Sequence, residues 1–451
     1  MLAAMASAAP SATVNIDELI DRQRFWRAGV WVVAWAIATM VADGFDLLSL
    51  SYVAPSIIER WDLTPAKFAI VFSWANFASM AGGIAAGYFA DRLGRKGTLI
   101  VATLVLGAST LGTALATSLN ELLTWRTIAG IGIGAVPPVA IVMVNECAPR
   151  NFRATLVSVL YLGTTIGNLL AASVAAALIA PLGWQIMFII GGIVPLVICG
   201  GLAAFMPESL RFLVARRPQS SRLPEVAARF TPGITYAADT HFITTTPPPA
   251  RDVPIAQLFT EGRAAPTLLF WGAYFASGFT LFSLQSWWPI ILRGLGLGDR
   301  LAFIVTGLSS LVGWMGGLVI TRCMDRFGLL TMMVPPLVGC VLLVTIGQLG
   351  GAPASLIAMV CLLSGAAYSG GHTALHATGG LIYPTEIRAN GVACGLVVTR
   401  LAGVVAPLIV AGLLPKAGAP GAAMWAVGLP LIAVAACYLG LSKLNAAGRN
   451  S

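Results

Sequence analysis

Apolar stretches of about 20 residues or more recur along the whole chain, and no other feature constrains its fold as strongly. Each stretch is long enough, as a helix, to cross a hydrocarbon core of ~30 Å. Backbone N–H and C=O groups inside that core must hydrogen-bond to one another because water is absent, and this predicts helices. Only 10% of the 451 residues are charged, whereas soluble chains are roughly a quarter charged. The chain is therefore predicted to be an integral membrane protein.

The predicted fold is an all-α membrane protein of twelve transmembrane helices, six on each side of a polar, Pro-rich linker. The predicted spans are 28–58, 65–90, 97–117, 121–147, 154–180, 184–206, 264–292, 300–321, 329–350, 353–383, 389–414 and 421–441. The resulting parts are an N-terminal segment (1–27), a six-helix bundle (28–206), the linker (207–263), a second six-helix bundle (264–441) and a tail (442–451). A short amphipathic helix is expected near 222–230 within the linker.

The net charge of +9 is explained by where the Lys and Arg residues lie. Most of the 27 fall in the termini, the linker and the loops on the same side of the membrane. The opposite side carries Arg60, Lys67, Arg293, Arg300 and Lys416. This bias follows the positive-inside rule and predicts a multi-pass membrane protein with both termini in the cytoplasm. The basic balance thus reflects contact with a lipid bilayer, and no nucleic-acid partner is expected.

Two landmarks recur at nearly one offset, which indicates an internal repeat. The sequence DRLG at 91–94 returns as DRFG at 325–328, 234 residues later. The sequence PRNFRA at 149–154 is answered by PTEIRA at 384–389, 235 residues later. Parallel six-helix repeats are typical of carriers whose substrate site lies between the halves near the membrane midplane.

Two motifs resemble those of the major facilitator superfamily. Residues 87–96, GYFADRLGRK, resemble its G-x-x-x-D-R-x-G-R-K loop, and 126–134, RTIAGIGIG, resemble its R-x-x-x-G-x-G-x-G helix. The resemblance covers 25–441 and implies two bundles related by a pseudo-twofold axis, together with a charged gate that clips them together when the carrier is outward-open. The residues assigned to this gate are Gly87, Asp91, Arg92, Arg95, Lys96, Glu146, Arg150, Asp325, Arg326, Glu386 and Arg388.

The alternative role for these charges is to anchor the topology. The second copy of the loop motif is degenerate, because Leu329 follows Gly328 where the first copy has a basic pair. A stronger latch is therefore expected in the first half.

Asp43 and Asp46 lie inside the first predicted span, where an ionisable side chain is costly unless it has a partner or faces a cavity. Their i, i+3 spacing places them on one helix face. Burial disfavours a charged carboxyl, so at least one of them is expected to carry a proton. A structural hydrogen bond to a neighbouring helix is the alternative. Gly44 between them allows a close approach of helices or a local break.

Arg126 and Arg400 are the only basic residues within the predicted spans, one in each half. A guanidinium stays protonated when buried, so each needs an anion. That anion is either Asp43 or Asp46 in a permanent pair, or a substrate carboxylate, whose geometry the guanidinium matches bidentately. We expect Arg126 to couple with the acids of the first span and Arg400 to bind the substrate.

His372 and His376 share one face of the tenth predicted span at i, i+4. Two ligands are too few for zinc, and the seven cysteines lack paired spacing, so no metal site is predicted. The histidines are assigned to substrate hydrogen bonding or proton transfer, with a structural hydrogen bond as the alternative. Phe45, Trp287 and Tyr368 are assigned to stacking on a flat substrate. Other aromatic candidates are Trp74, Tyr161 and Trp288.

A narrower resemblance is to the aromatic acid:proton symporter family within that superfamily. Its D-G-x-D…A-P pattern is matched by 43–46 and 54–55, and its Y-P-T-x-x-R-x-x-G pattern by 383–391. The resemblance implies functional charges at Asp43, Asp46, Asp91, Arg126, Glu146, Arg388 and Arg400. The tenth span departs from the family, because His372 and His376 stand where Gln and Asn are more usual.

The resemblance implies proton-coupled uptake of an aromatic carboxylate, such as a hydroxybenzoate, a phthalate-type acid or a phenylpropanoid acid. The proton is the expected coupling ion, no other cofactor is expected, and the carrier is expected to act as a monomer. A carrier of a sugar, polyol or other small organic acid is the alternative, since 207–209, PES, also resembles sugar carriers. A membrane enzyme is a remote alternative, because no nucleophile motif or nucleotide loop is found.

Overall fold

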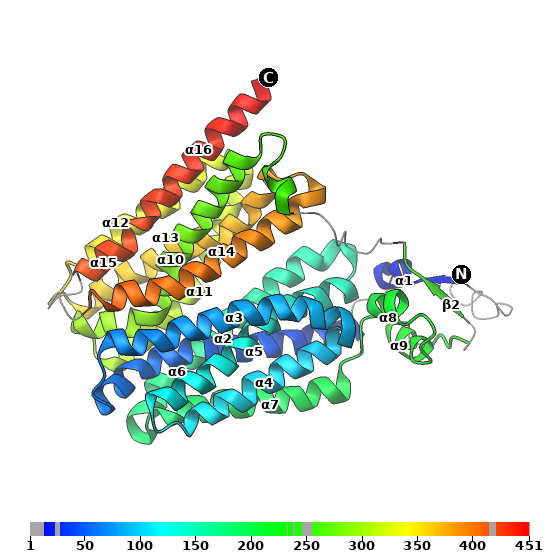
Figure 1. Ribbon diagram of the computed structural model, residues 1–451, viewed down its shortest axis with the longest axis horizontal. Coiled ribbons are helices and arrows are strands. Elements are labelled where there is room, and N and C mark those ends of the chain that lie inside the picture. The colour runs from blue at the N-terminus through cyan, green and yellow to red at the C-terminus, as the bar shows by residue number, and fades with distance from the viewer. Residues whose placement is uncertain are drawn as a thin grey trace.

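Twelve helical stretches of the described chain are long and apolar enough to cross a membrane, as predicted (Figure 1). The computed structural model describes residues 13–22, 28–231, 233–237, 240–245, 255–414 and 421–450. The first bundle contains α2 (Ala28–Arg60), α3 (Pro65–Leu93), α4 (Arg95–Ala114), α5 (Leu119–Cys147), α6 (Arg153–Leu182) and α7 (Gln185–Phe205). The second contains α10 (Ala264–Gly294), α11 (Asp299–Phe327), α12 (Val334–Ile346), α13 (Ala354–Ile382), α14 (Thr385–Ala411), α15 (Gly421–Gly428) and α16 (Pro430–Asn450).

The two bundles repeat one packing scheme. In the first, α2 packs on α6, α3 on α5 and α4 on α7. In the second, α10 packs on α14, α11 on α13 and α12 on α15 and α16. The last span is divided at Pro430, which cannot donate the backbone hydrogen bond that would continue α15.

Local geometry repeats as well. Gly94 and Gly328, which end the two DR-x-G sequences, both have positive φ angles, of 96° and 85°. This conformation favours glycine and allows the sharp break before the next helix. Arg153 donates to the Ala148 carbonyl oxygen at 3.1 Å, and Arg388 donates to that of Tyr383 at 3.4 Å. The spacing is five residues in both halves, so the repeat extends to single hydrogen bonds.

Close helix crossings explain why Gly44 stands between two acids. A Cβ atom at Gly44 would lie 2.1 Å from the Thr164 carbonyl oxygen of α6, and one at Gly167 would lie 2.1 Å from that of Val41 in α2. The two glycines therefore let α2 and α6 touch backbone to backbone. Of the two roles predicted for Gly44, close approach is the one observed, since α2 continues unbroken to Arg60.

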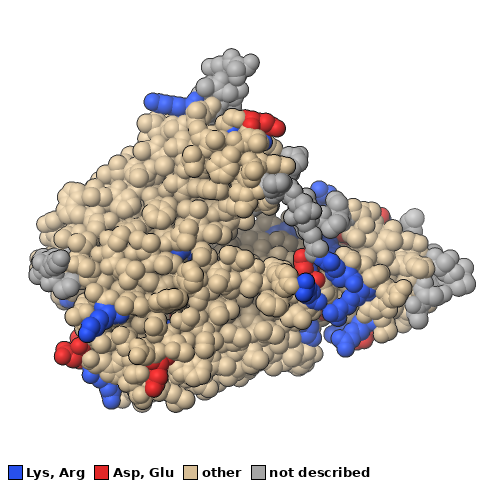
Figure 2. All heavy atoms as spheres, viewed as in Figure 1, with Lys and Arg blue, Asp and Glu red and all other residues tan. Residues whose placement is uncertain are grey.

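The halves meet at one end of the bundle and separate at the other. At the end remote from the linker, Glu59 pairs with Arg293 at 3.1 Å and the Ser51 hydroxyl donates to the Ser286 carbonyl oxygen at 2.9 Å. We call this the far end, and the opposite one the linker end. At the linker end the ribbons of the two bundles diverge, and the surface between them is hollowed (Figures 1 and 2). The cavity between the halves is therefore open toward the linker end.

A small cap covers the linker end of the first bundle. It contains β1 (Thr13–Asn15), α1 (Ile16–Arg22), α8 (Leu210–Arg216), α9 (Leu223–Phe230) and β2 (His241–Ile243). The turn Ile255–Phe259 follows before α10. The amphipathic helix expected near 222–230 is observed as α9, with its apolar side chains buried in the core of the first bundle. The predicted helical fold is observed, with one short addition in this cap, where the three-residue strands β1 and β2 pair in parallel. Three-residue strands so far apart in sequence leave no periodic signal.

Candidate substrate and proton site

Asp46 and Arg126 form a buried ion pair inside the first bundle. The two guanidinium NH groups of Arg126 donate to the two carboxylate oxygens of Asp46, one of them at 3.0 Å, and Thr110 Oγ1 donates to the same carboxylate at 2.8 Å. Asp46 is 0% exposed and Arg126 is 2% exposed. The predicted pairing of Arg126 with an acid of the first span is observed, and Asp46 is the partner.

Asp43, one turn earlier on α2, has no such partner. It is 3% exposed, and its Oδ1 atom is buried with no hydrogen-bond partner. Its carboxyl interacts electrostatically with Arg400 of α14, in the other half. No described acid lies within ion-pair distance of Arg400, whose guanidinium lies 5.8 Å from the Phe282 ring centroid. The first span thus carries one acid in a closed pair and one that faces an unpaired cation.

Two adjacent cavities lie between the halves. The larger, about 180 Å³, is lined by residues of α2, α6, α10, α11 and α13, among them Tyr161, Tyr368 and His376. The smaller, about 40 Å³, is lined by both arginines, Arg126 and Arg400. Gln285 of α10 lines both cavities and so marks the boundary between them.

The two histidines are hydrogen-bonded to α10. The Tyr274 hydroxyl lies 2.9 Å from His376 Nδ1, and the Ser277 hydroxyl lies 2.9 Å from His372 Nδ1. The imidazole rings are 5.4 Å apart. His376 lines the larger cavity, whereas His372 is buried beside it and lines neither cavity. Of the two assignments to substrate contact, the geometry fits His376 and not His372.

The aromatic assignments divide in the same way. Tyr368 lines the larger cavity, as do Tyr161 and Trp288. Trp287 lines neither cavity, because its indole donates to the Pro407 carbonyl oxygen and its ring packs edge-on against Phe72. Phe45 packs within the first bundle close to Gly191. Phe45 and Trp287 thus fill helix contacts in this conformation and line neither cavity, and their assignment to substrate stacking stays a prediction.

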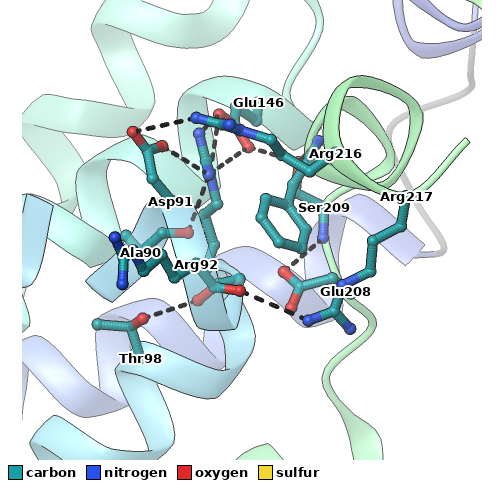
Figure 3. Close-up of polar contacts among 12 residues, drawn as sticks. Ala90, Asp91, Arg92, Thr98, Glu146, Glu208, Ser209, Arg216 and Arg217 are labelled. Atoms are coloured by element: carbon teal, nitrogen blue, oxygen red, sulfur yellow. Dashed lines mark hydrogen bonds and ion pairs between the residues drawn. The ribbon is translucent and has the colours of Figure 1, made fainter. Parts of the chain in front are cut away.

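Three residues of the predicted gate, Asp91, Arg95 and Glu146, form one network at the linker end (Figure 3). Arg95 donates to both carboxylate oxygens of Glu146, at 2.8 to 3.1 Å, and to Asp91 at 3.2 Å. Asp91 also lies 3.9 Å from Arg216 of the cap. The Arg92 guanidinium stacks on Tyr88, 4.2 Å from the ring centroid. A Cβ atom at Gly87 would meet nothing within 4 Å, so this face of α3 is uncovered.

Glu208 and Ser209 also belong to this network, although neither is among the gate residues predicted from the sequence. The Glu208 carboxylate accepts from the backbone N–H groups of Lys96 and Ser209, at 3.0 and 2.9 Å, and so caps the first turn of α4. The Ser209 hydroxyl bonds to Glu146. Burial raises the pKa of the Glu208 carboxyl, against the lowering effect of these hydrogen bonds. The PES sequence that resembles sugar carriers therefore contributes hydrogen bonds to the gate network. Its position between the sixth span and the linker is the sequence signal that could have indicated this role.

The predicted gate residues of the second half make fewer contacts. Asp325 and Arg326 are exposed, and Arg326 lies over the neighbouring Phe327 ring. The weaker latch expected there agrees with this difference. Glu386 lies in α14, but its side chain falls outside the described residues. Arg150 donates its backbone N–H to Asp21 of α1, and its repeat counterpart is not Arg388. Arg153 holds that place, and the gating role of Arg150 stays a prediction.

In the described residues, no group of three or more His, Cys, Asp or Glu side chains could hold a metal ion.

The helix order, the internal repeat and the buried charges can now be compared with known proteins. The family model described as Major Facilitator Superfamily matches residues 34–407. The chain belongs to the major facilitator superfamily. A superfamily member of this kind is a membrane transporter and not an enzyme, so the remote enzyme alternative is excluded.

Relatives of this superfamily member are named as carriers of aromatic acids. The gallate transporter of Pseudomonas putida is 30% identical over 438 residues, which cover 96% of this chain and 97% of the relative. The 4-hydroxybenzoate transporter PcaK of Pseudomonas aeruginosa is 30% identical over 410 residues, 89% of each chain. The 3-(3-hydroxy-phenyl)propionate transporter of Escherichia coli is 30% identical over 394 residues, 87% of this chain and 89% of the relative. The predicted resemblance to this group is confirmed.

Solved structures support the fold of the superfamily. A partially occluded inward-open structure of the xylose transporter XylE from E. coli has a TM-score of 0.70 at 18% identity, covering 91% of this chain and 96% of that one. A bacterial homologue of the lysosomal transporter Spinster has a TM-score of 0.68 at 18% identity, covering 93% and 96%. At this identity the likeness concerns the fold alone.

Proposed function

We propose that this transporter imports an aromatic carboxylate together with protons across the bacterial inner membrane, by alternating access. The relatives named as gallate, 4-hydroxybenzoate and hydroxyphenylpropionate transporters support the substrate class. The excess of Lys and Arg at the linker end supports a cytoplasmic position for that end and for both termini. The proton is the coupling ion, no other cofactor takes part, and a monomer suffices because each chain encloses its own site.

The observation that carries this proposal is the unpaired Arg400 at the boundary between the halves. A buried guanidinium remains charged and needs a compensating anion. No described acid pairs with it, and it lines a cavity next to one large enough for a small molecule. A substrate carboxylate is the anion that matches its planar fork with two parallel hydrogen bonds. A neutral sugar would leave this charge uncompensated, which argues against the alternative.

Asp43 is the proposed proton carrier. A buried carboxyl with an oxygen that lacks a hydrogen bond favours the protonated form, whereas one opposite a bare guanidinium favours the ionised form. When substrate occupies Arg400, the attraction between this guanidinium and an ionised Asp43 is weakened, and a proton on Asp43 becomes more favourable. Substrate and proton would then enter together. Asp46 is not free for this exchange while Arg126 and Thr110 hold both its oxygens.

The gate is proposed to work through the network of Arg95, Glu146 and Asp91. In the conformation described here the linker end is open and these charges contact each other and the cap. The uncovered face of α3 at Gly87 is where α14, which already packs on α3 nearer the far end, would close in the outward-open state.

The test of this proposal is ligand binding to the detergent-purified protein. Bound ligand stabilises a protein by RT ln(1 + [L]/Kd), about 2.7 kcal/mol at a hundredfold excess over Kd. We expect benzoates or cinnamates to raise the melting temperature and sugars to leave it unchanged. Arg400→Ala should abolish the shift, whereas Arg322→Ala, at an exposed arginine of α11, should preserve it. A shift with a neutral sugar, or an undiminished shift in Arg400→Ala, would overturn the proposal.

A further inference from the structure

Asn168 of α6 is a buried polar side chain that has no partner. It is 8% exposed, its Oδ1 atom is buried without a hydrogen bond, and it lines the larger cavity between the halves. A buried amide oxygen without a hydrogen bond destabilises the protein, because it has lost its bond to water and gained no other. Thr164, one turn before it on the same wall, also has a buried hydroxyl without a partner. Such groups at the edge of a cavity indicate a ligand that supplies the missing hydrogen bonds.

His376 presents a second polar group to the same cavity from the other half. Its Nδ1 atom is engaged with the Tyr274 hydroxyl at 2.9 Å, which fixes the ring and leaves Nε2 for a ligand. Whichever tautomer the ring adopts, Nε2 either donates or accepts. An amide offers both a donor and an acceptor. A hydroxyl group, which both donates and accepts, therefore satisfies either side chain.

The larger cavity has the size of one aromatic ring and adjoins the cavity lined by Arg400. A cavity of about 150 Å³ is known to hold one benzene molecule, and this one is about 180 Å³. Arg400 lines the adjoining smaller cavity, and Gln285 lines both. A single aromatic ring thus fits the larger cavity, which is lined by Asn168 and His376 and adjoins the cavity lined by Arg400.

We propose that Asn168 and His376 form a hydroxyl-binding subsite, so that the acids carried best bear a hydroxyl group on the ring away from the carboxylate. This inference rests on the proposed function and adds a substrate class to it. The two residues come from opposite halves, on α6 and α13, and line the same cavity. An acid without the hydroxyl fits the same space but leaves the Asn168 amide unsatisfied.

The experiment compares the binding of 4-hydroxybenzoate, 4-methylbenzoate and benzoate to the purified protein by titration calorimetry. The methyl compound matches the hydroxyl compound in shape and lacks its hydrogen bonds. We expect 4-hydroxybenzoate to bind at least about tenfold more tightly than 4-methylbenzoate or benzoate. A difference of this size corresponds to about one hydrogen bond to a buried group. Asn168→Leu should reduce this ratio toward one by weakening the hydroxylated acid alone, and His376→Leu should reduce it in part.

Ser173→Ala provides the matched control on α6, because Ser173 lines neither cavity and its hydroxyl already donates to the Leu169 carbonyl oxygen at 2.9 Å. Its ratio of affinities should equal that of the unmodified protein. Equal binding of the three acids by the unmodified protein, a measurement that needs no variant, would overturn the subsite and leave the carboxylate proposal standing. Equal loss for all three acids in Asn168→Leu would also overturn it. Absence of binding by any acid would instead count against the proposed function.

Discussion

Two carboxyls one turn apart on α2 have opposite surroundings. Asp46 is held by Arg126 and Thr110 within one bundle, whereas Asp43 has an oxygen without a hydrogen bond and faces Arg400 of the other bundle. A closed pair resists change, because separating it leaves a buried charge alone. A carboxyl between the bundles can respond to substrate and to their relative movement. We therefore propose that Asp46 is the structural acid of the pair and that Asp43 is the acid that exchanges a proton.

This division predicts different results for the two Asp→Asn variants. Asp46→Asn leaves Arg126 buried without a charge partner, a loss of about 3–5 kcal/mol in comparable buried pairs, and should lower the melting temperature markedly. Asp43→Asn should retain near-normal stability, abolish proton-driven accumulation of substrate and preserve counterflow. The measurements are thermal unfolding in detergent and uptake into proteoliposomes with and without a proton gradient. Full accumulation by Asp43→Asn would refute its role in coupling.

Helix contacts depend on glycines whose neighbours are backbone atoms. A Cβ atom at Gly44 would stand 2.1 Å from a carbonyl oxygen of α6, and backbone cannot move aside as a flexible side chain does. Gly200 of α7, by contrast, has nothing within 4 Å of a Cβ position. Two glycines in similar apolar helices are thus under different constraints.

Substitution by alanine should separate them. Gly44→Ala overpacks the α2–α6 crossing, and we expect a loss of about 1–3 kcal/mol or more, seen as low yield and a lower melting temperature. Gly200→Ala should be neutral or slightly stabilising, because alanine reduces the backbone conformational freedom of the unfolded chain. The comparison is made by size-exclusion profile and thermal unfolding. A tolerated Gly44→Ala would show that α2 and α6 can move apart without cost.

The capping of α4 by Glu208 predicts a dependence of stability on pH. Because burial raises the pKa of Glu208 above its ordinary value of 4.5, the folded protein holds this proton more tightly than the unfolded chain. Its stabilising contribution is complete below the ordinary value and is lost as the pH rises through the raised pKa. Glu208→Gln keeps an acceptor for the Lys96 and Ser209 N–H groups and cannot ionise. We expect its melting temperature to fall less between pH 4 and 7 than that of the unmodified protein, and an identical fall would contradict this explanation.

At the scale of the whole molecule, the structure is one state of an alternating-access cycle. The far end is closed by the Glu59–Arg293 pair, the Ser51–Ser286 hydrogen bond and the packing of Tyr52 on Phe303. Charged side chains gather at the two ends of the molecule and leave a broad uncharged band between them (Figure 2). Transport requires the far end to open and the linker end to close while this band stays in the bilayer.

Linking the two halves at the far end should stop this cycle. In the double variant Glu59→Cys/Arg293→Cys, a short bifunctional thiol reagent should hold the far end shut, so uptake falls to background while binding of substrate from the linker end persists. A cleavable reagent lets uptake recover on reduction. The two single-cysteine variants, treated in the same way, should retain transport. Normal uptake by the linked double variant would mean that this end does not open during transport.

Much of this arrangement could be predicted from the sequence alone. Span lengths are set by the bilayer, so the twelve helices followed from apolar length. Charged side chains inside a membrane are costly, so the few in the predicted spans could be selected as functional candidates from the sequence. These residues are Asp43, Asp46, Arg126 and Arg400. The recurrence of DR-x-G predicted the repeat, because both copies require a glycine at the same helix break. These features depend on local chemistry and on the membrane, both of which the sequence records.

Only the tertiary structure decided which of these residues meet. Both acids share one helix face, and rotation of α2 against α5 determined that Asp46 pairs with Arg126 and Asp43 faces Arg400. Aromatic residues look alike in sequence, yet Trp287 packs against α14 while its neighbour Trp288 lines the cavity. The unsatisfied amide of Asn168 could not be recognised before its neighbours were placed. Partnership between buried polar groups is a property of helix packing across distant segments, and no local pattern in the chain encodes it.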